Sequence, residues 1–370
     1  MLADKKNCSG CAACSAVCPV NAIEMKEDEE YFYYPVINNE ICISCKKCEH
    51  ICNAPVMFNS EFTGYAAQNL DLEVLAKSTS GGIVSAFCEE LIADGGLIYA
   101  AAYSVEKGGY WIGIETYEQI EKIRGSKYLQ IELTNEDYVY IQEELKSRKV
   151  LFIGTPCQVD GVKKVFSGAK ADNLFLIDII CGGVISSNIE TLYKRYLEKS
   201  GKKLVYRRFR SKIGGIWERV YHSEYRYEDG STSYFKGGED IYNRLYMSER
   251  LYRESCYNCK YVSKNRVGDV TVGDCWGIEK EDFQFPDAEK GVSLVLVNTA
   301  KGKEMLEGLS NVHMAKLSNQ EPIRENKPLH ECTKRHMMRN YSYRLFSALP
   351  FKFATGIVCY RYQIKRLLSR

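Results

Sequence analysis

Cysteines are the residues of this 370-residue chain with the most evident chemistry, and half of the sixteen follow one spacing. The pattern C-x2-C-x2-C-x3-C occurs twice, first at Cys8, Cys11, Cys14 and Cys18, and again at Cys42, Cys45, Cys48 and Cys52. Three thiolates on a tight loop can hold one face of an iron-sulfur cube. The repeat therefore predicts two 4Fe-4S clusters near the N-terminus.

The fourth cysteine of each run predicts how the ligands divide. In bacterial two-cluster ferredoxins this distant cysteine ligates the other cube. We therefore expect one cluster on Cys8, Cys11, Cys14 and Cys52, and the other on Cys42, Cys45, Cys48 and Cys18. The alternative is a pair of zinc sites, because CxxC pairs also bind zinc in tetrahedral geometry. Two runs of four closely spaced cysteines favour the clusters.

A second set of cysteines lies far from these runs. Cys157 and Cys181 each follow an apolar stretch that is typical of a strand, and Cys256 and Cys259 form a CxxC pair. Four such thiols can hold a third 4Fe-4S cluster, with Cys275 as a substitute ligand. The alternative is a group of buried thiols without ligands, because free cysteine packs well in cores. We expect Cys88, Cys332 and Cys359 to be packing residues.

Three loops have the composition of anion-binding turns or lie where ligands bind. Ser78-Thr79-Ser80-Gly81-Gly82 precedes a predicted helix, whose free amides can bind phosphate, although an ordinary helix cap has the same sequence. The apolar stretches 150–153 and 174–180 run into Gly154-Thr155-Pro156-Cys157 and Cys181-Gly182-Gly183. The carboxyl ends of strands in an open α/β sheet are where ligands usually bind.

Alternating strand-like and helix-like segments must position these loops. We expect strands at 95–103, 150–153 and 174–180, and helices at 71–77, 83–94, 135–148 and 189–199. This order predicts an α/β domain with a mixed or mainly parallel sheet. Residues 24–37 are predicted to form a hairpin within a ferredoxin-like module, and 204–235 to add antiparallel strands. The fold class is thus α+β for the module and α/β for the domain.

Several motifs in a fixed order resemble one known family. Ser78-Thr79-Ser80-Gly81-Gly82, Arg124-Gly125-Ser126-Lys127-Tyr128, Gly154-Thr155-Pro156-Cys157-Gln158 and the CxxC pair followed by GDVTVGDCWG resemble the family of coenzyme F-420 hydrogenase/dehydrogenase beta subunits. The similarity covers about residues 62–297. With the cysteine runs attached, the chain looks like the electron-input subunits that oxidise the reduced deazaflavin.

The resemblance implies an oxidoreductase that binds FAD. The flavin would exchange a hydride with a soluble two-electron carrier, such as the deazaflavin, and pass single electrons to the clusters, which relay them to or from a redox partner protein or ferredoxin. The residues that would line the FAD are Ser80, Gly81, Gly82, Gly125, Ser126, Lys127, Tyr128, Gly154 and Thr155. No catalytic residue is assigned. The alternatives are a flavin-free relay subunit and a redox protein that modifies cell-surface polysaccharides.

Composition excludes other classes. Fifty basic residues against 48 acidic ones give a net charge of +2, so we expect no nucleic-acid partner. No apolar stretch is long enough to span a membrane and no export signal precedes the cysteines, so we expect a cytoplasmic protein. We divide the chain into 1–58, 62–150, 151–340 and a basic amphipathic tail at 341–370. This tail packs on its own domain or contacts a partner or membrane surface.

Overall fold

The computed structural model describes residues 2–168 and 172–360. Its N-terminal module contains α1 (Ala13–Ala16), β1 (Ile23–Glu27), β2 (Tyr33–Ile37) and α2 (Lys47–Asn53). The strands pair antiparallel, with Ile23 opposite Ile37, which confirms the predicted hairpin. Ala12 and Lys46 precede the two helices in the same left-handed conformation, with φ values of 57° and 59°. The two cysteine runs therefore fold into equivalent loops.

A mixed sheet of eight strands forms the centre of the rest of the chain, as expected. It contains β3 (Thr63–Asn69), β4 (Leu97–Ser104), β5 (Gly108–Ile114), β6 (Val150–Gly154), β7 (Leu174–Ile179), β11 (Val270–Asp274), β12 (Ser293–Val297) and β13 (Val312–Lys316). The order is β13-β3-β12-β11-β7-β6-β4-β5. Strands β4, β6, β7 and β11 run parallel, so their carboxyl ends meet at one edge. Strands from both sides of residue 150 share this sheet.

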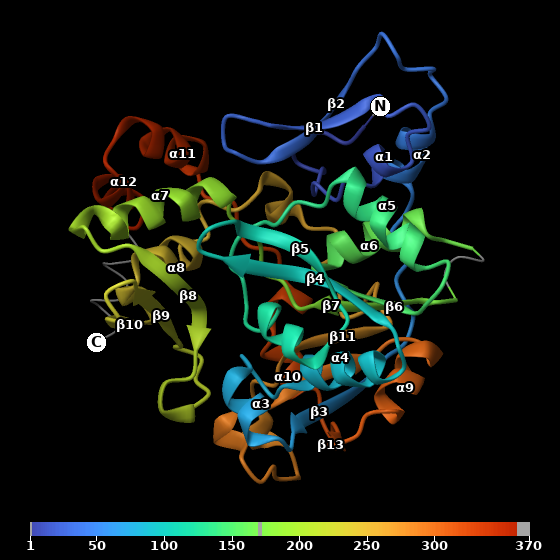
Figure 1. Ribbon diagram of the computed structural model, residues 1–370, viewed down its shortest axis with the longest axis vertical. Helices are drawn as coiled ribbons and strands as arrows, with labels where there is room; N and C mark the ends of the chain where they lie inside the picture. The colour runs from blue at the N-terminus through green and yellow to red at the C-terminus, as the bar shows by residue number, and fades with distance from the viewer. Residues whose placement is uncertain (1, 169–171, 361–370) are drawn as a thin grey trace.

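Helices cover both faces of the sheet because the central strands bury alternate residues on opposite sides. Leu151 and Ile153 pack with α4 (Ile83–Ala93) and α9 (Ala300–Glu307). Val150 and Phe152 pack with α5 (Asn135–Glu144) and α6 (Pro156–Val165). The short α3 (Leu72–Lys77) follows β3, and α10 (Glu321–Arg324) follows β13. All four predicted helices are present, with shifted ends (Figure 1).

A second, three-stranded sheet accounts for the predicted antiparallel strands. It comprises β8 (Leu204–Ser211), β9 (His222–Tyr227) and β10 (Thr232–Lys236). Its core is shared with α7 (Ser187–Leu197), α8 (Ile241–Met247), α11 (Arg339–Ala348) and α12 (Phe351–Val358). In the tail, Phe351 and Val358 are buried, whereas Phe353 and Ile357 are exposed. The rest of the predicted tail, 361–370, lies outside the described residues.

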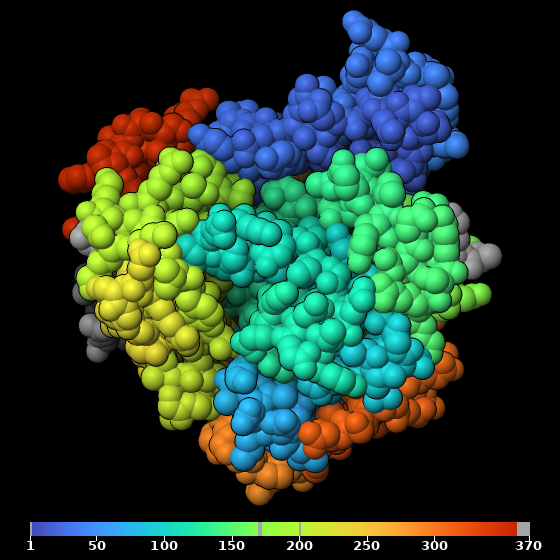
Figure 2. All heavy atoms as spheres, in the orientation of Figure 1, coloured from blue at the N-terminus to red at the C-terminus, as the bar shows by residue number. Residues whose placement is uncertain are grey.

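The N-terminal module packs against the helices of the central sheet. Helix α1 contacts α5 and α6, and in Figure 1 these helices lie together at one side of the molecule. Figure 2 shows the module as a lobe that projects from this side. Among the described residues, none of the helices is long and apolar enough to cross a membrane.

Candidate cofactor cavity and metal centres

A large cavity opens at the carboxyl ends of β6, β7 and β11. Its volume is about 1200 Å³. Single small-molecule sites usually occupy about 300–1,000 Å³, so this cavity has room for more than one group. Eight of the nine residues expected to bind FAD line it: Ser80, Gly82, Gly125, Ser126, Lys127, Tyr128, Gly154 and Thr155. Gly81 lies within the same turn.

The serine-glycine turn, residues 78–82, is fixed by strands β3 and β12 and joined to the predicted loop at residues 124–128. The Gly81 amide donates to Ser293 Oγ at 3.0 Å, and the Gly81 carbonyl accepts from the Asn69 amide at 2.7 Å. A Cβ on Gly81 would lie 2.4 Å from the Ala67 carbonyl oxygen, so only glycine fits. The Ser126 amide donates to Thr79 Oγ1 at 3.2 Å. Two motifs distant in sequence thus form one wall of the cavity.

The predicted loop that begins at Gly154 joins the cavity to the thiols. Thr155 caps α6, and its amide donates to Gln158 Oε1 at 3.0 Å. Gln158 in turn donates to the Ile131 carbonyl at 2.8 Å, which fixes the loop against the neighbouring segment. Thr155 Oγ1 lies 3.3 Å from Cys157 Sγ. A cofactor on Gly154-Thr155 would therefore adjoin the third group of cysteines.

Lys127 and Tyr128 differ in what they contribute. Burial and the nearby Arg208 guanidinium lower the pKa of Lys127 to about 7. Its Nζ donates to the carbonyls of Ile123 and Arg124, so the side chain is held inside the cavity wall and is not a surface lysine. The Tyr128 ring stacks on Tyr246, with centroids 4.5 Å apart. The first residue offers charge to an anion and the second offers an aromatic surface.

The four cysteines predicted for a third cluster come together. Cys157, Cys181, Cys256 and Cys259 all line the cavity, close enough for their thiolate charges to repel one another. Burial raises the pKa of Cys157 to about 12 and that of Cys181 to about 11. Buried thiols of this kind become thiolates when a metal supplies positive charge. Backbone hydrogen bonds lower the pKa values of Cys181 and Cys259 against the effect of burial, and such bonds also tune cluster sulfurs. The donor set fits a 4Fe-4S cluster.

The N-terminal thiols group in the expected way across the two runs. Burial raises the pKa of the Cys11 thiol most, and the charges of Cys8 and Cys52 raise it further. The pKa of Cys48 is likewise raised by burial and also by the charge of Cys18. Each set of three thus lies near the fourth cysteine of the other run. Within residues 2–168 and 172–360, no three His, Cys, Asp or Glu side chains converge as around one metal ion. A cube holds its four thiolates on four different irons, so its ligands lie farther apart.

The third group of thiols lies beside the first run. Cys157 and Cys11 are close enough for their thiolate charges to interact. Tyr138 donates to the Cys11 carbonyl at 2.6 Å, and a Cβ on Gly161 would lie 3.0 Å from the Cys11 Cβ. Helices α5 and α6 therefore hold the first cysteine run directly against the cavity.

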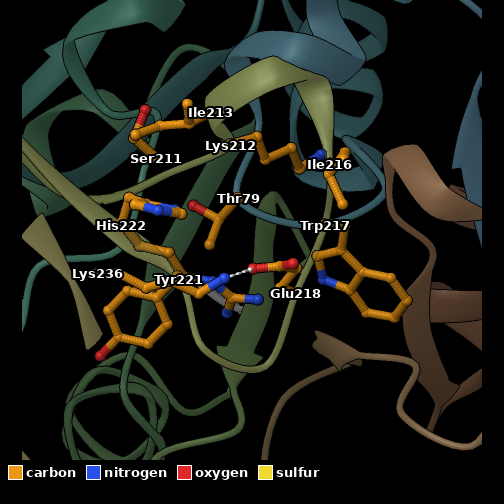
Figure 3. A pocket seen from close by; sticks show the side chains of 11 residues that line it. Thr79, Ser211, Lys212, Ile213, Ile216, Trp217, Glu218, Tyr221, His222 and Lys236 are labelled. Carbon is orange, nitrogen blue, oxygen red and sulfur yellow. Dashed lines mark ion pairs between the residues drawn. The ribbon is translucent and has the colours of Figure 1, made fainter. Parts of the chain in front are cut away.

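A smaller pocket of about 170 Å³ adjoins the cavity, and the two share Thr79, Arg210 and Tyr221 (Figure 3). Its cationic groups are already paired. Arg210 binds Asp274 at 2.6 Å, and Lys236 binds Glu218 at 3.1 Å. Lys212 donates to backbone carbonyls, among them that of Ser80 at 2.6 Å. Lys212, which directly follows β8, therefore holds the serine-glycine turn in place.

Two expectations about single cysteines are wrong. Cys275 is fully buried in a separate core beneath β12 and does not line the cavity, so it is not placed to substitute as a ligand. Cys332, expected to be a packing residue, lines the cavity and lies beside Cys259, whose carbonyl is 3.5 Å from its sulfur. Cys88 and Cys359 are buried as expected. No spacing signal points to Cys332, because it is alone in its segment.

Sequence reasoning also missed Trp217, which lines the smaller pocket, and Arg253, which lines the cavity. Trp217 stacks on Trp276, with centroids 4.3 Å apart and planes at 4°, and Trp217 Nε1 donates to Asp274 Oδ1 at 2.9 Å. Trp276 belongs to the GDCWG motif, whereas Trp217 comes from the segment between β8 and β9. Arg253 belongs to the segment just before Cys256.

Residues 147–322 match the family model for the C terminus of the coenzyme F420 hydrogenase/dehydrogenase beta subunit, and residues 7–56 match that for a 4Fe-4S dicluster domain. The chain is 24% identical over 194 residues to an F(420)H(2) dehydrogenase subunit of Methanosarcina mazei, covering 47% of this chain and 53% of that protein. It is 35% identical over 51 residues to a 7Fe ferredoxin of Hydrogenibacillus schlegelii, covering 14% of this chain and 59% of the ferredoxin. These matches span little more than half the length of either relative.

A solved structure is also similar. It is of the F420-reducing NiFe hydrogenase complex from Methanosarcina barkeri, with 17% identity, a TM-score of 0.47, and coverage of 74% of this chain and 91% of that chain. The two family models confirm the resemblance that the motifs predict, although the beta-subunit model begins after the first two motifs and extends beyond residue 297.

Proposed function

Because this chain carries a domain of the coenzyme F420 hydrogenase/dehydrogenase beta-subunit type behind a 4Fe-4S dicluster domain, we propose that it is an iron-sulfur flavoprotein oxidoreductase. FAD would occupy the large cavity and the thiols would hold three 4Fe-4S clusters. When bound, the flavin would exchange a hydride with a two-electron carrier and exchange single electrons with the clusters.

One observation carries this proposal: the cavity and the three groups of thiols form a continuous series. The three predicted FAD loops line the cavity, and Thr155 links them to Cys157. Cys157 lies near Cys11 of the first group, and that group shares the small N-terminal module with Cys42, Cys45 and Cys48. A flavin, which exchanges two electrons, would thus lie next to a series of clusters that each transfer one electron.

The chain's own groups would bind and orient the cofactor. Free amides at the start of α4 and the Lys127 amine suit an anionic pyrophosphate, and the ring of Tyr128 suits a flat apolar surface. The buried side chains around Cys157 would exclude water from the path to the first cluster. At the other end Cys45 is exposed, which would let the second cluster reach a redox partner protein.

The deazaflavin is the two-electron carrier that we propose, because it is named in both the matching family and the relative from Methanosarcina mazei. The test is anaerobic stopped-flow mixing of the cluster-loaded protein with reduced deazaflavin. We expect flavin reduction first and cluster reduction second. In Cys157→Ser the flavin should still be reduced while the N-terminal clusters lag at least tenfold.

Two results would contradict the proposal. If the clusters of flavin-free protein were reduced as fast as those of flavin-loaded protein, the chain would be a relay subunit that catalyses no hydride transfer. If neither the reduced deazaflavin nor a nicotinamide reduced the protein, the proposed carrier would be wrong. The alternative of a redox protein that modifies cell-surface polysaccharides would then remain.

A further inference from the structure

Arg253 joins the segment of the CxxC pair to the first cysteine run. Its side chain is 1% exposed. Its guanidinium donates from Nε to the Cys8 carbonyl at 2.9 Å and from Nη2 to the Tyr33 carbonyl at 2.8 Å. Nη1 donates to Gln130 Oε1 at 3.0 Å, and Nη2 lies 3.8 Å from Cys8 Sγ. Three residues later in the chain, Cys256 lines the cavity.

The packing around this guanidinium is tight on both sides. It lies over the Tyr34 ring, 4.2 Å from its centroid. Gly10, between Cys8 and Cys11, has a φ of +73°, and a Cβ there would lie 2.9 Å from Arg253 Nη1 and 2.8 Å from Gln130 Nε2. The first cysteine loop is therefore shaped to admit the guanidinium.

The charge of Arg253 distinguishes it from the other buried arginines. Arg207, Arg210, Arg266 and Arg339 each pair with a carboxylate: Glu190, Asp274, Asp178 and Glu30, respectively. Arg253 takes part in none of the ion pairs among the described residues. Glu132 lies within its electrostatic reach, but burial raises the pKa of that carboxyl to about 7. A buried cation without a partner is costly, so a compensating anion is expected here.

We infer that the compensating anion is the iron-sulfur cluster held by Cys8, Cys11, Cys14 and Cys52, and that Arg253 positions this cluster and raises its reduction potential. A cluster with four thiolates is negative and gains a further negative charge on reduction, so a nearby cation favours the reduced form. The inference needs a cluster at these thiols but does not depend on the flavin of the proposed function.

The test is an EPR-monitored redox titration of anaerobically purified full-length protein, with iron and flavin measured on the same sample. Arg253→Gln should lower the midpoint potential of one cluster and leave the others unchanged. Arg253→Lys, which keeps the charge, should shift it less. The control is Arg339→Gln. Arg339 is equally buried and also contacts the module, through Glu30, but none of its hydrogen bonds or ion pairs among the described residues is with a thiol. We expect no potential shift in this control.

The outcomes separate the roles. Loss of about four irons from Arg253→Gln alone, with retention in Arg253→Lys and Arg339→Gln, also supports the inference, because it shows that the cation holds that cluster. Unchanged midpoints in a fully loaded Arg253→Gln would overturn it, and so would equal effects of Arg253→Gln and Arg339→Gln. A flavin-free wild type with a potential that depends on Arg253 would refute the proposed function and leave this inference standing.

Discussion

At the scale of single residues, Cys259 and Cys332 lie side by side, but we expect only Cys259 to be a cluster ligand. The thiolate charges of Cys157, Cys181 and Cys259 all act on Cys256, whereas Cys332 lies against the Cys259 carbonyl, 3.5 Å from its oxygen. We therefore predict that Cys259→Ser lowers iron from about twelve to about eight per chain, and that Cys332→Ser keeps about twelve. Iron and acid-labile sulfide analysis decides this. Equal losses in both variants would make Cys332 a ligand.

Lys127 gives the cavity a pH dependence. Its pKa is about 7 in the folded protein without ligand, against the usual 10.5. If the FAD pyrophosphate lies against this amine, as we propose, it would hold the amine protonated, so FAD binding would take up a proton above pH 7 and none below it. The dissociation constant for FAD should be flat below pH 7 and rise up to about tenfold per pH unit above it.

The Lys127 prediction is checked by fluorescence titration of flavin-depleted protein. Lys127→Met should bind FAD more weakly below pH 7 and lose the slope above it. Lys149→Met, at an exposed amine paired with Asp94 outside the cavity, is the matched control and should keep the slope. A slope retained in Lys127→Met would place the titrating group elsewhere.

At the scale of elements, the serine-glycine turn depends on the close approach of β3. Gly81→Ala would place a methyl group 2.4 Å from the Ala67 carbonyl and 2.5 Å from the Ser293 amide. The overpacking should cost about 1–3 kcal/mol of unfolding free energy and reduce the flavin that copurifies. Gly356→Ala in α12, where a Cβ meets nothing within 4 Å, should be neutral or stabilising by up to about 1 kcal/mol. Urea denaturation and flavin absorbance measure both.

A buried ion pair fixes β7 to the segment before β11. Arg266 binds Asp178 Oδ1 at 2.6 Å, and Asp178 Oδ2 accepts from the Gly268 amide at 2.9 Å and from Thr271 at 3.0 Å. Asp178→Ala leaves the guanidinium unpaired in the core, so it should cost about 3–5 kcal/mol. Asp94→Ala breaks the exposed pair with Lys149 and should cost about 0–1 kcal/mol. Chemical denaturation of both variants at one pH compares them, and similar losses would contradict the prediction.

The elements that sequence reasoning located are those with a strong local signal. Strand β6 and strand β7 are continuous apolar stretches, and the hairpin of the module lies between two runs of fixed cysteine spacing. The partners of isolated residues were not predictable. Arg253 meets Cys8, and Cys332 meets Cys259, only because distant segments pack together. Local periodicity does not encode these tertiary contacts.

At the scale of the whole molecule, the order in which the parts pack would set the direction of the proposed electron relay. The cavity lies at one edge of the central sheet, the third group of thiols lines it, and α5 and α6 hold the first cysteine run beside that group. The module projects beyond these helices (Figure 2), where Cys45 is exposed. Electrons would thus pass between an interior flavin and an exposed terminal cluster.

The measurement that tests this account most directly is the cofactor content of anaerobically purified protein: iron, acid-labile sulfide and extracted flavin, read beside the EPR spectrum of the reduced state. We predict about twelve irons and one FAD per chain, with the spectrum of interacting 4Fe-4S clusters. About eight irons and no flavin would contradict the account, because the cavity would then hold neither the third cluster nor the hydride-accepting cofactor.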